Sequence, residues 1–322
     1  MVLLSDEFVI MSQPGEYFNY WPKSAITYTA NDVIDISASS TFPAILHDGI
    51  ETNSGLILFS KTQQFLLTTD SDILTPITAK INAISTYNFN STSNPISLGT
   101  TTGFLDNAGK YSRFWEMANV LREGEPIVID QTKVVSNLLD KDINKISNSK
   151  ENSIIFFSKK NSTVLYGFKY FNTSDKRLQS SWFTWEFNGK VIHHAVLDDA
   201  LYVVIRNPDN NKDSLQKISI KLDSDTNTII DDRNNTDSSD DITYRIYLDS
   251  IYKLSSGLGT YDSVTDSTTF TTPEGFSSFE NLKLYDNNTS SDDVGELVTI
   301  SEGSETQLVV DGNWSSRDSI LG

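Results

Sequence analysis

The stretch SWFTWEFNGKVIHHAVLDDALYVVIR occupies residues 181–206 and decides the fold class. Its first seven residues alternate between two faces of a strand, with Trp182, Thr184 and Glu186 on one face and Phe183, Trp185 and Phe187 on the other. Asn188-Gly189 then favours a type I′ hairpin turn, because both central residues of that turn need a positive φ. KVIHHAV (190–196) and ALYVVIR (200–206) follow as further strands. The stretch therefore predicts an antiparallel meander with tight turns.

The same pattern continues on both sides of this stretch. Other segments rich in aromatic and β-branched residues are expected to be strands, at residues 7–12, 32–38, 55–60, 64–69, 153–158, 163–171, 214–222, 242–248, 282–285, 296–300 and 306–310. In the clearest part of the chain, strands recur about every 10–12 residues. We therefore predict an all-β fold built mainly of antiparallel meanders, a pattern shared by propellers, sandwiches and barrels.

Two segments are less regular. Residues 111–123 suit either an amphipathic helix or an aromatic strand, and this choice stays open. A short helix is expected within residues 131–146, where Val134, Leu138 and Ile143 are loosely spaced.

Negative charge is concentrated at one end of the chain. The 322 residues contain 25 Lys and Arg against 43 Asp and Glu, which gives a formal net charge of −18. Residues 1–222 contribute −3 of this charge and residues 223–322 contribute −15. The polar, acidic stretch near residues 223–241 predicts a linker or loop at a domain boundary. An acidic surface also disfavours tight binding of nucleic-acid phosphates.

The residues that usually carry catalysis are scarce. The absence of cysteine excludes disulfides, thiolate metal sites and cysteine nucleophiles. The histidines are His47, His193 and His194, and the adjacent pair lies on an expected strand, so its rings point to opposite faces and cannot chelate one ion. Motifs for a serine-hydrolase elbow or a phosphate-binding loop are missing. We expect no catalytic residue, no metal site and no cofactor.

One short segment resembles the start of a calcium loop. Asp223, Asp225 and Asn227 have the spacing of its first oxygen ligands. Thr228 stands where the sharp turn needs glycine, and Asn234 where the loop needs a bidentate glutamate. A solvated acidic loop is therefore the favoured interpretation.

Carbohydrate chemistry is the main enzymatic alternative. A glycosidase needs only two carboxyl groups, but spacing cannot select a pair among 43 acids. The aromatic residues Trp182, Phe183 and Trp185 suit a sugar platform, although alternating aromatics on a strand more often pack in a core. The triplets that begin at Asn90, Asn161 and Asn172 match the N-glycosylation pattern, which an Asn-, Ser- and Thr-rich chain also produces by chance.

The segment MSQPGEYFNYWPKSA (residues 11–25) resembles a segment of the tail nozzle proteins, or tail tubular proteins B, of short-tailed bacteriophages. The matching residues are Ser12, Gly15, Glu16, Tyr17, Phe18, Asn19, Tyr20 and Trp21. Collinear matches follow in residues 56–76, 110–118 and 164–187, the last through Arg177, Gln179, Ser180, Trp182 and Trp185. The resemblance runs from about residue 4 to residue 207. It is looser beyond that point, in residues 269–276 and 312–316.

The resemblance implies a structural virion protein and no enzymatic activity. In this family six copies form the distal tail tube, below an adaptor ring of tail tubular protein A. Tail fibres dock at that junction, and the genomic DNA leaves through the lumen without specific binding. The resemblance also implies a β-propeller-like domain, which we place at residues 1–222, followed by a smaller acidic β domain at residues 223–322.

Three further expectations accompany this assignment. The protein is expected in the tail of the virion, without a membrane anchor, since no apolar run approaches the length of a membrane span. Nozzle proteins are usually longer, so we expect this chain to be a segment of a longer protein or a short member of the family. The alternative function is a secreted β protein that binds carbohydrate or hydrolyses glycosides.

Overall fold

The computed structural model describes residues 1–38, 44–118, 126–173, 176–208, 210–220, 229–231, 243–245, 251–273, 282–288, 295–304 and 306–322. These residues form 28 β-strands and one turn of 3-10 helix, η1 (Lys133–Val135). All strand pairs among the described residues are antiparallel, for example β1 with β2, β21 with β28 and β26 with β27. The predicted all-β fold of antiparallel meanders is thus confirmed. The chain divides into two compact units, Met1–Ile220 and Lys221–Gly322.

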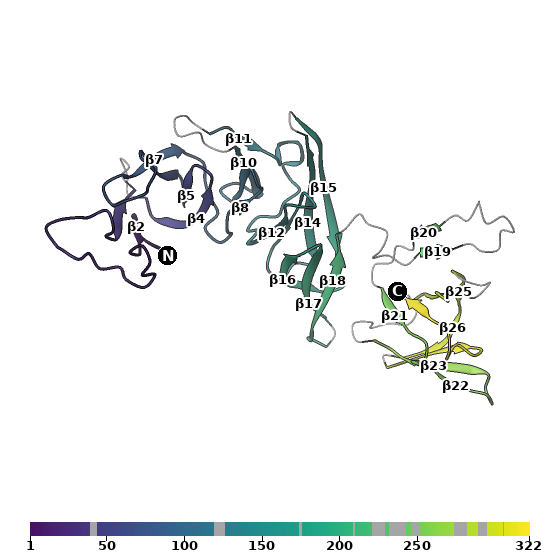
Figure 1. Cartoon of the computed structure of the whole chain (residues 1–322). Helices are drawn as coiled ribbons and strands as arrows, with labels where there is room; N and C mark the ends of the chain where they lie inside the picture. The colour runs from purple at the N-terminus through teal and green to yellow at the C-terminus, as the bar shows by residue number, and fades with distance from the viewer. Residues whose placement is uncertain are drawn as a thin grey trace. The chain divides into compact units, whose positions relative to one another are not determined.

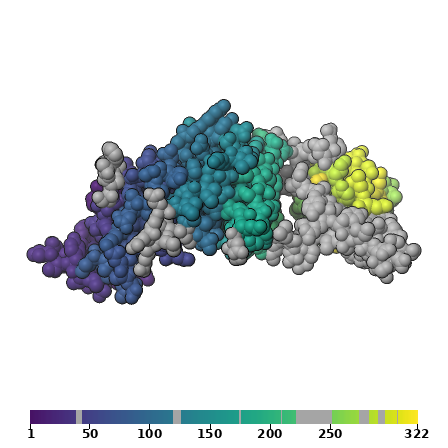
Figure 2. Space-filling model, turned by 90° about the horizontal axis from the view of Figure 1, so that it is seen from above, coloured from purple at the N-terminus to yellow at the C-terminus, as the bar shows by residue number. Residues whose placement is uncertain are grey.

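Five sheets follow one another in chain order along the first unit, as the colours from purple to teal show in Figures 1 and 2. Their strands, sheet by sheet, are β1 (Val2–Ser5), β2 (Phe8–Met11) and β3 (Ile34–Ser37); β4 (Leu46–Thr52), β5 (Gly55–Ser60), β6 (Gln64–Thr69) and β7 (Ala79–Ser85); β8 (Ile96–Ser97), β9 (Thr101–Asp106), β10 (Arg113–Ala118) and β11 (Val128–Asp130); β12 (Lys145–Ser149), β13 (Ile154–Ser158), β14 (Val164–Asn172) and β15 (Arg177–Glu186); β16 (Lys190–Leu197), β17 (Ala200–Arg206) and β18 (Asp213–Ser219). Each sheet is a simple meander, in which strands that follow in sequence are paired.

Each pair of consecutive sheets encloses a cluster of buried apolar side chains. Representative residues of the four clusters, in chain order, are Val9 with Leu58, Phe59 with Phe104, Phe114 with Phe157, and Phe156 with Leu201. An inner sheet therefore buries both of its faces, which is why β5 and β13 are almost continuously apolar. Burial of one such aromatic side chain contributes about 1.5–3 kcal/mol.

The first strands of the sheets lie next to one another. β1 contacts β4, β4 contacts β8, β8 contacts β12, and β12 contacts β16. The sheets thus stack face to face with their first strands at one common edge. Later strands extend away from that edge, and the β14–β15 hairpin is the longest of them (Figure 1).

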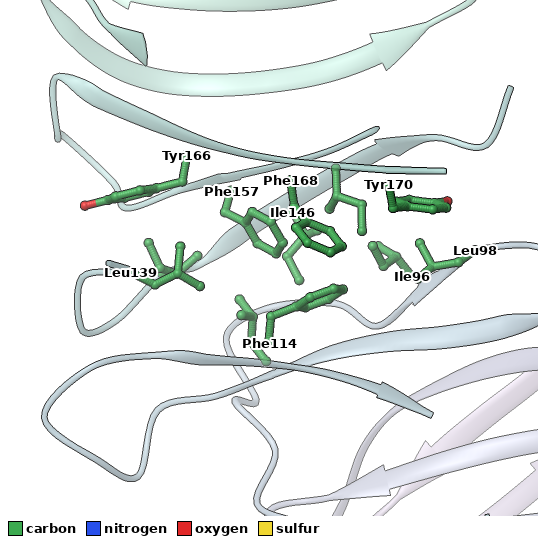
Figure 3. Close-up of a cluster of buried hydrophobic side chains, with 12 residues drawn as sticks. Ile96, Leu98, Phe114, Leu139, Ile146, Phe157, Tyr166, Phe168 and Tyr170 are labelled. Carbon is green, nitrogen blue, oxygen red and sulfur yellow. The ribbon is translucent and has the colours of Figure 1, made fainter. Parts of the chain in front are cut away.

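The third cluster joins the sheet β8–β11 to the sheet β12–β15 (Figure 3). Phe114 lies at its centre. The Phe114 ring is 5.0 Å from the ring of Phe157, 6.2 Å from that of Phe168 and 6.5 Å from that of Trp182, measured between centroids. All three contacts are close to edge-to-face, the preferred geometry of aromatic pairs.

The second unit contains two four-stranded sheets with one shared apolar cluster, and a separate pair of strands. The cluster includes Leu254, Phe270, Leu284, Leu308 and Val310. The first sheet has the order β21 (Tyr252–Leu254), β28 (Ser319–Leu321), β24 (Leu284–Asp286), β25 (Leu297–Val298); the second has β22 (Thr260–Asp262), β23 (Ser267–Thr271), β27 (Gln307–Asp311), β26 (Ile300–Gly303); and the pair is β19 (Ile229–Asp231) with β20 (Thr243–Arg245).

The structure shows which secondary structure the two irregular segments, residues 111–123 and 131–146, adopt. Residues 113–118 form strand β10, and residues 119–123 lie outside the described residues. The expected short helix is reduced to η1, a single 3-10 turn. β15 begins at Arg177, four residues before the predicted start, because Arg177 to Ser180 pair with the end of β14.

Candidate functional site

A charged group lies between the third and fourth sheets. Glu116 of β10 and Arg177 of β15 form a bidentate ion pair, with both N–O distances 2.8 Å. The side chain of Glu116 is 6% exposed and that of Arg177 is 22% exposed. Charge-assisted, bidentate bonds of this kind are the strongest hydrogen bonds that side chains form.

Neighbouring polar groups complete this network. Gln131 Nε2 donates to Glu116 Oε2 at 2.7 Å, and Thr101 Oγ1 donates to Oε1 at 2.8 Å. Arg177 Nε donates to Asn172 Oδ1 at 2.8 Å. Both charges are therefore well supplied with hydrogen-bond partners, as a buried pair requires.

The network also connects to the aromatic core. Trp182 Nε1 donates to the backbone oxygen of Gln131 at 3.1 Å, and the Arg177 guanidinium lies 5.2 Å from the centre of the Tyr170 ring. Burial, and to a smaller extent the Glu116 carboxylate, raises the pKa of Tyr170. This group of residues fixes the orientation of one sheet on the next and has the features of a structural joint.

The sequence pointed to Arg177 and Trp182 but not to Glu116, the partner of Arg177. The available signal was local, since Glu116 is the one acid within the apolar strand RFWEMA and an acid in that position must be paired when it is buried. Gln179 and Ser180, which share the motif with Arg177, are exposed on β15.

The residues of the GEYFNYW motif form a loop between β2 and β3. We call residues 13–32 the aromatic arm; it follows β2 and extends away from the sheets (Figure 1). Its base is a tight turn, in which Asn19 Nδ2 donates to Gln13 Oε1 at 2.8 Å and Asn19 N donates to Glu16 O at 3.0 Å. Gly15 has a φ of +81°, which favours glycine there.

The other end of the arm is also held. Asp32 accepts hydrogen bonds from Thr29 N at 2.6 Å and from Thr29 Oγ1 at 2.9 Å, and these bonds lower the pKa of Asp32. Between the two ends, five large apolar side chains are 60–91% exposed: Tyr17, Phe18, Trp21, Ile26 and Tyr28. Aromatic residues concentrated on an exposed segment are typical of a protein interface.

Comparison with known proteins gives the family. The bacteriophage nozzle protein family model matches residues 1–322. The chain belongs to this family. It is also 25% identical over 278 residues to tail tubular protein gp12 of Escherichia phage T7, a match that covers 84% of this chain and 33% of that protein. The chain thus spans about a third of the length of this curated relative.

Membership of the nozzle family makes the chain a structural protein of the phage tail and places it in the virion. The resemblance carried by the arm and by Arg177 to Trp185 is confirmed at the level of the family. In the structure these two motifs form a projecting loop and a buried joint between sheets.

The adjacent histidines of this nozzle-family chain lie on opposite faces of β16, as alternation predicts. His193 is exposed, whereas His194 is buried, with its Nδ1 2.6 Å from Ser147 Oγ. Among the described residues, His194 Nε2 has no hydrogen-bond partner. Burial, together with Lys145 and then His193, lowers the pKa of His194 to about 3. The ring is neutral at physiological pH and acts as a core residue.

Acid should therefore destabilise the first unit through His194. The unfolded ring has a pKa of about 6.5, so between about pH 6.5 and pH 3 the unfolded state binds the extra proton. The free energy of unfolding should fall in this window by up to about 1.4 kcal/mol per pH unit from this group. Urea unfolding at several pH values measures how the free energy of unfolding depends on pH. This dependence should be shallower for His194→Asn than for His193→Asn. Equal slopes for the two variants would contradict this assignment.

The aromatic residues considered for a sugar platform lie on opposite faces of β15. Trp182 packs into the cluster between the third and fourth sheets, and Phe183 and Trp185 pack into the next cluster. Their rings contact core aromatics, with Trp182 4.6 Å from Phe168 and Trp185 5.5 Å from Phe156. The core interpretation applies to all three.

The remaining singled-out residues are placed as follows. Asn90 is buried and donates to Ile143 O at 2.6 Å, so it is a core residue and cannot accept a glycan. Asn161 is an exposed turn residue with a φ of +63°. Asn172 accepts a hydrogen bond from Arg177. His47 is exposed on β4. Asp223, Asp225, Asn227, Thr228 and Asn234 lie outside the described residues, as does most of the 223–241 segment.

In the described part of the chain, no group of three or more His, Asp or Glu side chains is arranged to hold a metal ion. The same residues include no helix of the length and hydrophobicity needed to cross a membrane.

Proposed function

We propose that this chain forms part of the wall of a hexameric tail nozzle, without enzymatic activity. In this proposal the hexamer sits below the adaptor ring of tail tubular protein A, tail fibres dock at the junction, and the genome passes through the lumen. The observation that carries the proposal is the match of the nozzle family over residues 1–322. A stack of sheets joined by four apolar clusters and a buried ion pair suits a rigid wall.

We further propose that residues 1–222 form a propeller-like domain and residues 223–322 a smaller acidic domain. Consecutive four-stranded meanders are the blades of propellers, and three of the five sheets have this form. Contact between successive first strands also supports the proposal, because blades meet along their innermost strands.

The uneven charge has a role in this proposal. A lumen lined by acidic residues repels DNA phosphates, so the genome moves through without adhering. The −15 charge of residues 223–322 is the source of that repulsion. A map of the assembled ring that places residues 223–322 on the outer wall would remove this role.

The oligomeric state tests the proposal. Mass photometry of the purified chain should show a species with six times the mass of the 36.0 kDa chain. An electrophoretic mobility assay should show no retention of double-stranded DNA at physiological salt. A stable monomer that turns over a glycan would support the carbohydrate alternative, although its candidate platform residues Trp182, Phe183 and Trp185 pack in cores.

A further inference from the structure

The aromatic arm needs a surface to bind. Phe18 is 85% exposed and Trp21 is 81% exposed, so the arm leaves its aromatic side chains uncovered within its own chain. Hydrogen bonds at Asn19 and Asp32 form a turn at each end of the arm, so part of its conformation is fixed within its own chain. A pre-shaped loop loses little conformational entropy on binding, which favours affinity.

The same unit carries an apolar groove. It lies beside β11, the edge strand of the third sheet, has a volume of about 520 Å³, and includes Trp115, Val128 and Ile129 in its walls. We call it the β11 groove. Ile129 is 52% exposed, and the neighbouring Val134 of η1 is 95% exposed. Among the described residues, the buried Trp115 Nε1 has no hydrogen-bond partner.

The charges around the groove match those of the arm. Arg113 and Lys133 line the groove, with Asp130 as the single acid. The arm carries the exposed carboxylate of Glu16 next to Tyr17 and Phe18, and the cation of Lys23 two residues after Trp21. An aromatic projection with Glu16 therefore fits an apolar hollow with a basic lining.

We propose that the aromatic arm of one copy inserts into the β11 groove of a second copy of this chain. The inference rests on the proposed ring and names the surfaces that build it. Each copy has one arm and one groove at different places, so the contact is heterologous, and repetition of such a contact closes a ring when the rotation between copies allows it. Phe18 and Trp21 are the anchors, since buried aromatics dominate interface energies.

Three variants of the full chain test this inference. The arm variant is Phe18→Ser with Trp21→Ser, and the groove variant is Ile129→Glu. The control is Ile73→Ser with Ile77→Ser, which removes side chains that are 70% and 72% exposed on the β6–β7 loop. Because the altered side chains are exposed, the melting temperature of each variant should stay that of the parent chain.

The arm variant and the groove variant should each raise the concentration needed for half-assembly at least tenfold, as measured by mass photometry. The control should assemble like the parent chain. An equimolar mixture of arm and groove variants retains one intact arm and one intact groove, so it should form dimers and nothing larger.

Three outcomes contradict the inference in different ways. If the parent chain forms hexamers and the arm variant does so at the same concentration, the arm contact is wrong while the nozzle proposal stands. If the parent chain itself remains a monomer, both the ring and the contact are wrong. A mixture that forms no dimer, when each variant alone is defective, would also reject the pairing of arm with groove.

Discussion

Arg177→Leu should lower the free energy of unfolding of the first unit by about 3–5 kcal/mol, the usual cost of removing one partner of a buried ion pair. The substitution leaves the Glu116 carboxylate, 6% exposed, without its bidentate partner. Gln131 and Thr101 still donate to Glu116, but neither carries a compensating charge. Urea denaturation followed by tryptophan fluorescence measures the change.

Two comparisons separate this effect from a general loss of surface charge. Arg206→Leu breaks the exposed pair with Asp213, whose side chains are 40% and 43% exposed, and should cost far less than Arg177→Leu, because solvent screens exposed pairs. Adding Glu116→Leu to Arg177→Leu removes the unpaired charge, so the double variant should be more stable than the sum of the single changes predicts. If Arg177→Leu lowers the free energy of unfolding no more than Arg206→Leu does, the Glu116–Arg177 pair is not a structural joint.

Phe114→Ala should also cost about 3–5 kcal/mol, because it opens a cavity in a packed core. Phe114 is fully buried and contacts aromatic rings from β13, β14 and β15 (Figure 3). The lost side chain belongs to the third sheet and its neighbours belong to the fourth, so the cavity lies at the interface of the two sheets.

Phe171→Ala is the matched control for this prediction. Phe171 is the same residue type but is 52% exposed near the end of β14. Its replacement should change the free energy of unfolding by less than about 1 kcal/mol, as for most surface positions. Comparable losses for the two variants would mean that the third cluster does not hold the sheets together.

The fold class was predictable because its signals are local. Alternation in residues 181–187 and the Asn188-Gly189 turn identify a hairpin without any knowledge of distant residues. Strands such as β7 (AKINAIS) and β9 (TTGFLD) were not predicted. Their sequences are polar or contain glycine, and they become strands by pairing with the more apolar β6 and β10.

The joint and the groove were beyond sequence reasoning for a different reason. Glu116 and Arg177 are 61 residues apart, and only the stacking of two sheets brings them together. Gly167 is a similar case, since the Phe183 ring on β15 lies over it and a Cβ at that position would come within 2.1 Å of the ring. Such close approaches depend on register between strands, which the pattern of residue types does not fix.

The sequence identifies the arm through its resemblance to a family motif, which does not show whether its side chains are buried or exposed. Aromatic residues occur both in cores and at interfaces. The structure shows Phe18 and Trp21 exposed, whereas Trp182 and Trp185 of the other motif pack in cores. The same residue type thus packs in cores in one motif and is exposed in the other, where we propose that it contacts a second copy.

The negative charge of the chain is unevenly distributed between its two units. Because most of the negative charge lies in residues 223–322, the net charge of the first unit is close to zero. Apolar and charge-matched contacts between copies of that unit are therefore not opposed by strong repulsion. An acidic surface disfavours adhesion to DNA, which is compatible with the proposed conduit.

Electron microscopy of the purified chain tests the central claim most directly. Two-dimensional class averages of end-on views should show six-fold rings with a central opening, and a reconstruction should place β-sheet stacks of the first unit in the ring wall. Particles that remain single 36.0 kDa chains at every concentration, or that assemble without a central opening, would contradict the account.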